Sequence, residues 1–89
     1  MKTLVICRPA AGVSGMQLAA GAEDEMATLR RLRDEGLLLE AYWPGRPGAI
    51  LIFDVGGEQL EQAMASLPFV RDGLLEYERI PLRPFSALG

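Results

Sequence analysis

The stretch LLLEAYWPGRPGAILIFDV, residues 37–55, decides the fold of this chain. Its two ends are apolar and rich in residues that favour strands. The segment Pro44 to Gly48 between them contains two prolines and two glycines, a composition typical of turns. Two strand-like segments separated by a short turn predict an antiparallel hairpin, with strands at 37–43 and 49–55.

A helix is predicted on each side of this hairpin. In the segment 23–35, Met26, Leu29 and Leu32 recur at three-residue spacing and form one apolar stripe. The segment 58–66 has its apolar residues at helical spacing and is followed by a proline that ends the helix. The alanine- and glycine-rich segment 10–22 is interpreted as a long loop with a helical turn around 16–20.

Two more strands complete the pattern, at 3–7 and 74–82. The element order is therefore strand, helix, strand, strand, helix, strand. This order predicts an α+β fold of the ferredoxin-like β-α-β-β-α-β type, with a four-stranded antiparallel sheet. With 89 residues, the chain is expected to form one domain over 1–89, with a proline-containing tail at 81–89.

Right-handed crossovers place both predicted helices on one face of the sheet and leave the other face bare. Hydrophobic residues make up 49% of this small chain, which is more apolar material than one thin core hides. We expect the bare face to be covered by a second copy, which gives a homodimer or a higher homo-oligomer. Two such faces packed together would form a barrel-like dimer that encloses a pocket.

Alternation along the strands predicts which side chains lie on the bare face. In the last strand these are Glu76, Glu78 and Ile80, and in the second strand they are Leu38, Glu40 and Tyr42. For the strand at 49–55 alternation does not decide which set of side chains faces the helices. The two sets are Ile50, Ile52 and Asp54, and Ala49, Leu51 and Phe53.

Composition argues against several classes of function. The net charge is −3 without a basic stripe, so no nucleic-acid partner is expected. The chain has no histidine and a single cysteine, Cys7, so neither a metal site nor a redox cofactor is expected. No apolar run approaches the length that spans a bilayer. We expect no membrane association and a cytoplasmic location.

The bare face carries the candidate chemistry. A carboxylate enclosed among apolar side chains has a raised pKa and is suited to removing a proton from carbon. Glu40 and Glu76 are the candidates for this base, and Tyr42 is the candidate hydrogen-bond donor to a developing enolate. The predicted binding residues are two alternative arginines for a substrate carboxylate, an indole at the pocket mouth and a neighbouring carboxylate: Arg8 or Arg79, Trp43 and Glu78. The competing interpretation is that Glu76 and Glu78 protect an exposed edge strand against aggregation.

Several segments resemble the muconolactone isomerase family. They are Arg31 to Gly36, Phe53 to Val55, Met64 to Pro68, Glu76 and Pro84, and together they span roughly residues 23–86. The helix end at Leu67-Pro68 and the residues after it are also similar to YCII-like and EthD-like proteins of the dimeric α+β barrel group.

This resemblance implies a ferredoxin-like subunit that dimerises through its open sheet face, without a cofactor. It also implies an isomerase that moves a double bond in an unsaturated lactone, or in a related small organic acid, by proton transfer. The sequence departs from the family in lacking the histidines that the enzyme carries around its second strand and hairpin. Two alternatives therefore stay open: a cofactor-free monooxygenase-like or YCII-like barrel enzyme, and a non-catalytic module for small-molecule binding or assembly.

Overall fold

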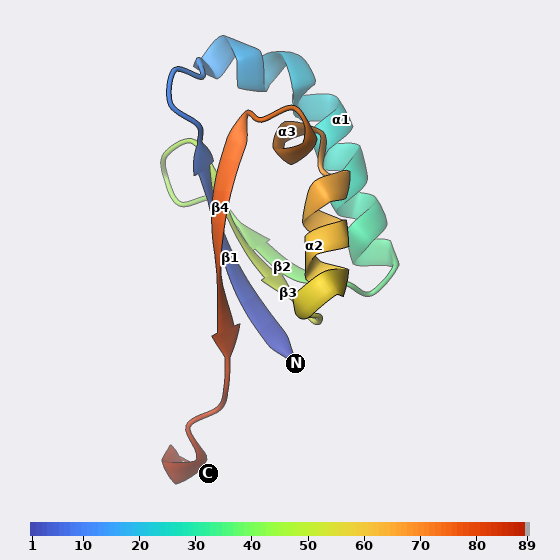
Figure 1. The fold of residues 1–89 in the computed structure, drawn as a ribbon, viewed down its shortest axis with the longest axis vertical. Helices are drawn as coiled ribbons and strands as arrows, with labels where there is room; N and C mark the ends of the chain where they lie inside the picture. Colours follow the sequence, from blue (N-terminus) through green and yellow to red (C-terminus); the bar gives the residue numbers. More distant parts are fainter. Residues whose placement is uncertain (89) are drawn as a thin grey trace.

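The computed structural model describes residues 1–88 and has the expected α+β architecture (Figure 1). Four strands form one antiparallel sheet in the order β2-β3-β1-β4. The bounds of the elements are β1 Lys2–Pro9, α1 Gly15–Asp34, β2 Leu38–Tyr42, β3 Ala49–Phe53, α2 Gly57–Ser66, α3 Pro68–Arg71, β4 Leu75–Leu82 and the 3₁₀ helix η1 Ser86–Leu88. The ferredoxin-like order predicted from the hairpin is confirmed.

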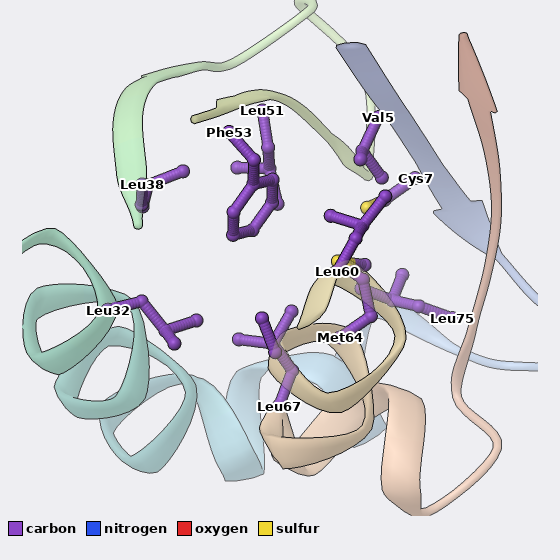
Figure 2. Close-up of a cluster of buried hydrophobic side chains, with 11 residues drawn as sticks. Val5, Cys7, Leu32, Leu38, Leu51, Phe53, Leu60, Met64, Leu67 and Leu75 are labelled. Carbon is purple, nitrogen blue, oxygen red and sulfur yellow. The ribbon is translucent and has the colours of Figure 1, made fainter. Parts of the chain in front are cut away.

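The helices α1, α2 and α3 all lie on the same side of the sheet, and the other side is open (Figure 1). The core forms between them. Val5, Leu51 and Phe53 extend from the sheet toward Leu32 of α1 and Leu60 of α2 (Figure 2), and each of these five side chains is at most 1% exposed. The strand β3, which alternation left undecided, therefore directs Leu51 and Phe53 to the helices.

The segment predicted as a long loop is largely helical. Helix α1 begins at Gly15, where the Ser14 side chain accepts a hydrogen bond from the Gln17 backbone N–H (3.2 Å) and the Gln17 side chain accepts one from the Ser14 N–H (2.8 Å). This reciprocal capping box satisfies two of the N–H groups that a helix start leaves free. Residues 23–25 consequently lie inside the helix, and the prediction that they form its first turn was wrong. The helix ends as expected, with Gly36 in the left-handed region at φ 79°.

Strand β2 contains an irregularity that simple alternation does not anticipate. Leu38 pairs with Phe53 and Glu40 pairs with Ile52, with a register shift between them. The extra residue, Leu39, is 42% exposed, while Leu38 is 6% exposed and lies in the core. A bulge of this kind lets Leu38 and Glu40 lie on opposite faces although they are two residues apart. The prediction that Leu38 lies on the bare face was wrong.

Beyond β4 the chain leaves the body and ends in η1, so that the C-terminal segment projects away from the sheet (Figure 1). In residues 1–88 we find no helix with both the length and the apolar character that crossing a membrane requires.

Candidate functional site

The open face of the sheet carries both apolar and charged side chains. The register places in one row Tyr42, Ile50, Ile6 and Glu78, from β2 to β4, because directly paired residues of antiparallel strands lie on the same face. The next row contains Glu40, Ile52, Leu4 and Ile80, and Arg8 pairs with Glu76 at the far end of β1. Five of the seven predicted site residues therefore share this face: Arg8, Glu40, Tyr42, Glu76 and Glu78.

Arg8 lies between two carboxylates of the neighbouring strand. Its Nε is 3.9 Å from Glu76 Oε2 and its Nη1 is 4.0 Å from Glu78 Oε1. All three side chains are between 57% and 58% exposed, so in a single copy these pairs contribute little to stability. They do hold three charged groups in one place, with the carboxylates on both sides of the guanidinium.

This cluster borders a cavity of about 530 Å³ on the open face. Its walls come from two parts of the chain: the open-face residues Ile6, Arg8, Ile50 and Glu78, and the hairpin loop residues Pro44, Arg46 and Pro47. The volume falls in the range of about 300–1,000 Å³ that is usual for small-molecule sites. Arg46 was not among the predicted residues, although it is the one charged residue of the Pro/Gly turn.

Gly48 fixes the end of the hairpin loop that forms one wall of this cavity. Its φ is +123°, and a Cβ atom at this position would lie 2.2 Å from the Cys7 carbonyl oxygen. Only glycine combines this backbone conformation with so close an approach to β1. The loop therefore stays beside the strand that carries Arg8.

Glu40 and Tyr42 form a second polar pair, near the β2 edge of the open face. The Tyr42 hydroxyl donates a hydrogen bond to Glu40 Oε1. This hydrogen bond and the negative charge of Glu40 raise the pKa of the Tyr42 hydroxyl above its ordinary value. From β2 to β4 the sheet spans three strand spacings, about 14 Å. Glu40 and Glu76 of one chain therefore lie too far apart to act on the same atom.

The remaining two predicted residues lie elsewhere. Arg79 pairs with Val5 and so lies on the helix-covered side, where it forms an ion pair with Glu61 of α2. Glu61 also accepts a hydrogen bond from the Tyr77 hydroxyl at 3.2 Å. The structure thus places Arg79 apart from the open-face cavity, and of the two alternative arginines it brings only Arg8 to that site.

Trp43 follows the end of β2 and is 75% exposed. It borders a groove of about 500 Å³ between α1 and β2, together with Met26, Leu29 and Arg30. Glu40 and Tyr42 belong to the strand that forms one edge of this groove, so they lie between the groove and the open face. Trp43 is therefore close to a cavity mouth, but to that of the groove and not to that of the open-face cavity.

Within residues 1–88 no three histidine, cysteine, aspartate or glutamate side chains lie close enough together to hold a metal ion. The open-face site is accordingly described by its arginine, carboxylate and hydroxyl groups alone.

Comparison with solved structures identifies the fold. The chain superposes on 5-chloro-2-hydroxyhydroquinone dehydrochlorinase (TftG) from Burkholderia phenoliruptrix AC1100, in complex with 2,5-dihydroxybenzoquinone, with a TM-score of 0.77 and 15% sequence identity over 98% of both chains. It superposes on muconolactone isomerase with a TM-score of 0.76 and 19% identity, over 98% of this chain and 93% of that one. The chain has the muconolactone isomerase-like fold.

The resemblance of residues 23–86 to the muconolactone isomerase family is therefore confirmed at the level of fold, and the match extends over nearly the whole chain. A scan against family models finds no match, and a search of curated proteins finds no relative. The muconolactone isomerase-like fold is thus retained here at low sequence identity, where packing and element order are kept and most individual residues differ.

Proposed function

We propose that this protein is a cofactor-free acid–base enzyme that isomerises a small unsaturated cyclic organic acid, such as a lactone carrying a carboxylate. The site is the open-face cavity, closed by the open face of a second copy. The observation that carries this proposal is the position of Arg8, which lies between Glu76 and Glu78 at a cavity of about 530 Å³.

The cavity offers two cationic groups, Arg8 and Arg46, beside the carboxylate of Glu78. A guanidinium binds a carboxylate through parallel N–H donors, so Arg8 is suited to hold the acid group of the substrate, with Arg46 on the opposite wall. Apolar Ile6 and Ile50 line the same cavity and are suited to contact a ring. This combination of a few convergent polar groups and apolar walls is typical of small-molecule sites.

The reaction requires a base and no redox partner. A glutamate carboxylate takes the proton from the carbon beside the carbonyl group, the electron pair moves into an enolate, and the proton returns at the other end of the conjugated system. Sequence reasoning assigned the base to Glu40 or Glu76 and a binding role to Glu78. Because Glu78 lines the cavity, we assign the base first to Glu78 and second to Glu76. Glu40 and Tyr42 form the hydrogen-bonded pair that the partner's face would meet.

The reactions named for the two structural neighbours support this class of chemistry. One name states an isomerisation of muconolactone, and the other states the removal of hydrogen chloride from a hydroxylated ring compound. Both names refer to small oxygenated ring compounds. Two enzymes with this fold and related chemistry favour an acid–base role for the present chain.

Self-association is proposed from the composition of the open face. Ile80 and Leu82 are 42% and 38% exposed, and Leu4, Ile6, Ile50 and Ile52 share the same face. Apolar surface arranged in contiguous rows is typical of an interface. Its burial against a second copy also excludes water from the cavity, which strengthens the interactions between charged groups and substrate.

The activity is tested by following the ultraviolet absorbance of a panel of unsaturated lactones and cyclic acids. We expect turnover by the wild type and a loss of about 100-fold or more in kcat for Glu78→Gln, because general base catalysis contributes about that much. Glu76→Gln tests the second candidate. Glu58→Gln, an exposed carboxylate in the first turn of α2, is the matched control and is expected to keep full activity. Unchanged rates in both Glu76→Gln and Glu78→Gln would exclude the assignment.

The oligomer is tested separately by sedimentation equilibrium. Ile6→Lys introduces a charge at the centre of the open face, and we expect it to weaken self-association by about 100-fold or more while the helical circular dichroism is retained. Gln59→Lys, at an exposed position of α2 on the other side of the sheet, is the control for an added charge. A wild type that sediments as a monomer at about 100 μM would contradict the enclosed site.

A non-catalytic binding module is the second candidate, favoured by the exposure of Glu76 and Glu78 in a single copy. It predicts that calorimetry detects binding of lactone acids, that Arg8→Gln weakens this binding, and that no product forms over hours. Turnover by the wild type excludes it.

A further inference from the structure

A buried carboxylate on the other side of the sheet takes no part in the site described above. Glu25 lies in α1 and is only 7% exposed. Its Oε1 accepts a hydrogen bond from the Phe69 backbone N–H at 3.0 Å, at the start of α3. The charged residues of an amphipathic helix ordinarily lie on its solvated face, and Glu25 departs from that rule.

The second oxygen of this carboxylate is not engaged. Within residues 1–88 Oε2 of Glu25 makes no hydrogen bond, and no side-chain nitrogen or oxygen of the described residues is sealed off without a partner. Oε2 must therefore remain in contact with accessible space. Glu25 is one of the residues that line a cavity of about 180 Å³.

The rest of the cavity is apolar. Its walls are formed by Leu18, Ala22 and Met26 of α1, by Phe69 of α3, and by Leu75 of β4. It lies on the helix-covered side, where β3 and β4 begin. It shares Met26, Leu29, Gly48 and Ala49 with the groove between α1 and β2, so a ligand has a route from the surface. The site thus combines apolar walls, a buried carboxylate whose Oε2 accepts no hydrogen bond, and an opening to the surface.

We propose that this cavity binds a single-ring phenol, whose hydroxyl donates a hydrogen bond to Glu25 Oε2 and whose ring packs against Leu18, Phe69 and Leu75. An apolar cavity of about 150 Å³ accommodates benzene, so about 180 Å³ suits one substituted ring. A lone carboxylate oxygen selects a ligand that can donate, because a hydrogen bond to a charged acceptor is stronger than one between neutral groups.

The charge of the Glu25 carboxylate further restricts the class of ligand that can bind. Burial raises the pKa of the Glu25 carboxyl, while the Phe69 N–H and the nearby Arg71 lower it. When Glu25 is ionised, a benzoate of the same size meets a like charge in a small apolar cavity and is disfavoured. A neutral phenol meets no such repulsion. Ligand choice therefore depends on the hydroxyl and not on the ring alone.

The proposal is tested by ¹⁹F NMR titration of the wild-type chain at pH 7 with three probes of matched size: 4-fluorophenol, 4-fluorotoluene and 4-fluorobenzoate. We expect 4-fluorophenol to bind with a Kd at least about tenfold lower than either of the others. In ¹⁵N spectra the Phe69 amide should shift with the phenol, because it shares the Glu25 carboxylate with the ligand. Equal affinity for all three probes, or no binding of the phenol at about 10 mM, would overturn the proposal.

Variants separate binding from a structural role of Glu25. Ala22→Leu fills the cavity without touching the carboxylate and should abolish phenol binding, while Ala19→Leu, one turn earlier on the exposed part of α1, should leave it unchanged. Glu25→Gln keeps an acceptor for the Phe69 N–H and replaces the free oxygen by an amide NH₂ donor, so the preference for phenol over toluene should fall below about threefold. A preference that survives in Glu25→Gln would contradict the assigned contact. Glu78→Gln should bind the phenol as the wild type does, which keeps this site distinct from the open-face cavity.

Discussion

The two faces of the sheet are built from alternating residues of the same strands, yet their apolar side chains are buried to different extents. On the helix-covered face Val5, Leu51 and Phe53 are at most 1% exposed. On the open face Ile80 and Leu82 are 42% and 38% exposed, although they are as hydrophobic. Side-chain hydrophobicity alone therefore does not distinguish a core face from an interface face.

The difference lies in the charged residues between the apolar ones. The covered face carries Thr3 as its buried polar side chain, and the Thr3 hydroxyl donates a hydrogen bond to the Val55 carbonyl at 2.8 Å. Its charged residue Arg79 is not buried: the side chain is 43% exposed and forms an ion pair with Glu61. The open face carries Arg8 between Glu76 and Glu78. A core excludes such groups because their desolvation is costly, whereas a face that is closed by a partner and holds a site retains them. Three measurements sharpen this contrast.

The largest expected effect is on the core. Phe53→Ala should lower the free energy of unfolding by about 3–5 kcal/mol, because Phe53 is fully buried and its loss leaves a cavity among Leu51, Leu38 and Leu60. Its neighbour Ile52 points to the open face. Ile52→Ala should cost less than about 1 kcal/mol at low protein concentration, and more when the protein self-associates.

Urea unfolding at two protein concentrations measures both effects. An Ile52→Ala loss as large as that of Phe53→Ala at the lower concentration would mean that the open face is already part of a monomeric core. That result would remove the contrast between the two faces.

The second effect concerns the hairpin loop between β2 and β3. Gly48→Ala should destabilise the fold by about 3 kcal/mol, since it combines strain at φ +123° with a Cβ only 2.2 Å from the Cys7 carbonyl. The φ of Gly12 is also positive, at +81°, but a Cβ added at Gly12 would meet nothing within 4 Å. Gly12→Ala should therefore cost only about 1 kcal/mol. Thermal unfolding compares the two, and equal losses would show that the approach to β1 is unimportant.

The smallest effect is a pH dependence from the covered face. Burial raises the pKa of Glu25, so the folded state binds its proton more tightly than the unfolded state. Stability therefore falls as pH rises from the unfolded pKa through the folded one, and the contribution of Glu25 is most favourable below that window. The difference in unfolding free energy between wild type and Glu25→Gln, measured from pH 4 to pH 7, should change in this direction. A difference that stays constant with pH would show that Glu25 is no more desolvated than an exposed glutamate.

Much of the fold was readable from local patterns. The Pro/Gly turn predicted the hairpin of β2 and β3, the 58–66 pattern predicted α2 to within one residue, and Gly36 marked the end of α1. The start of α1 was missed although Ser14 and Gln17 carry the spacing of a capping box. The abundance of glycine and alanine in 10–22 hid that signal. The short helix α3 was also missed, because four residues show no periodicity.

The candidate site was predictable only in part. Alternation in β4 correctly placed Glu76 and Glu78 on the open face, because a regular strand keeps its period of two. The same rule misplaced Leu38, because the bulge in β2 breaks the period there. It also left Arg79 as a candidate beside Arg8, although neighbouring strands place these two residues on opposite faces. Arg46 and Glu25 became visible only when the loop and α3 were in place.

The sequence by itself determined the order of elements, the hairpin at residues 37–55 and the acidic side of β4, because turns, helical periodicity and alternation depend on neighbours along the chain. Tertiary structure alone decided which face of β3 is buried, where the bulge falls in β2, and that Glu25 lies in an apolar cavity rather than in water. These features depend on segments far apart in the sequence, such as Glu25 and Phe69, which are separated by 44 positions, and no local pattern records the contact between them.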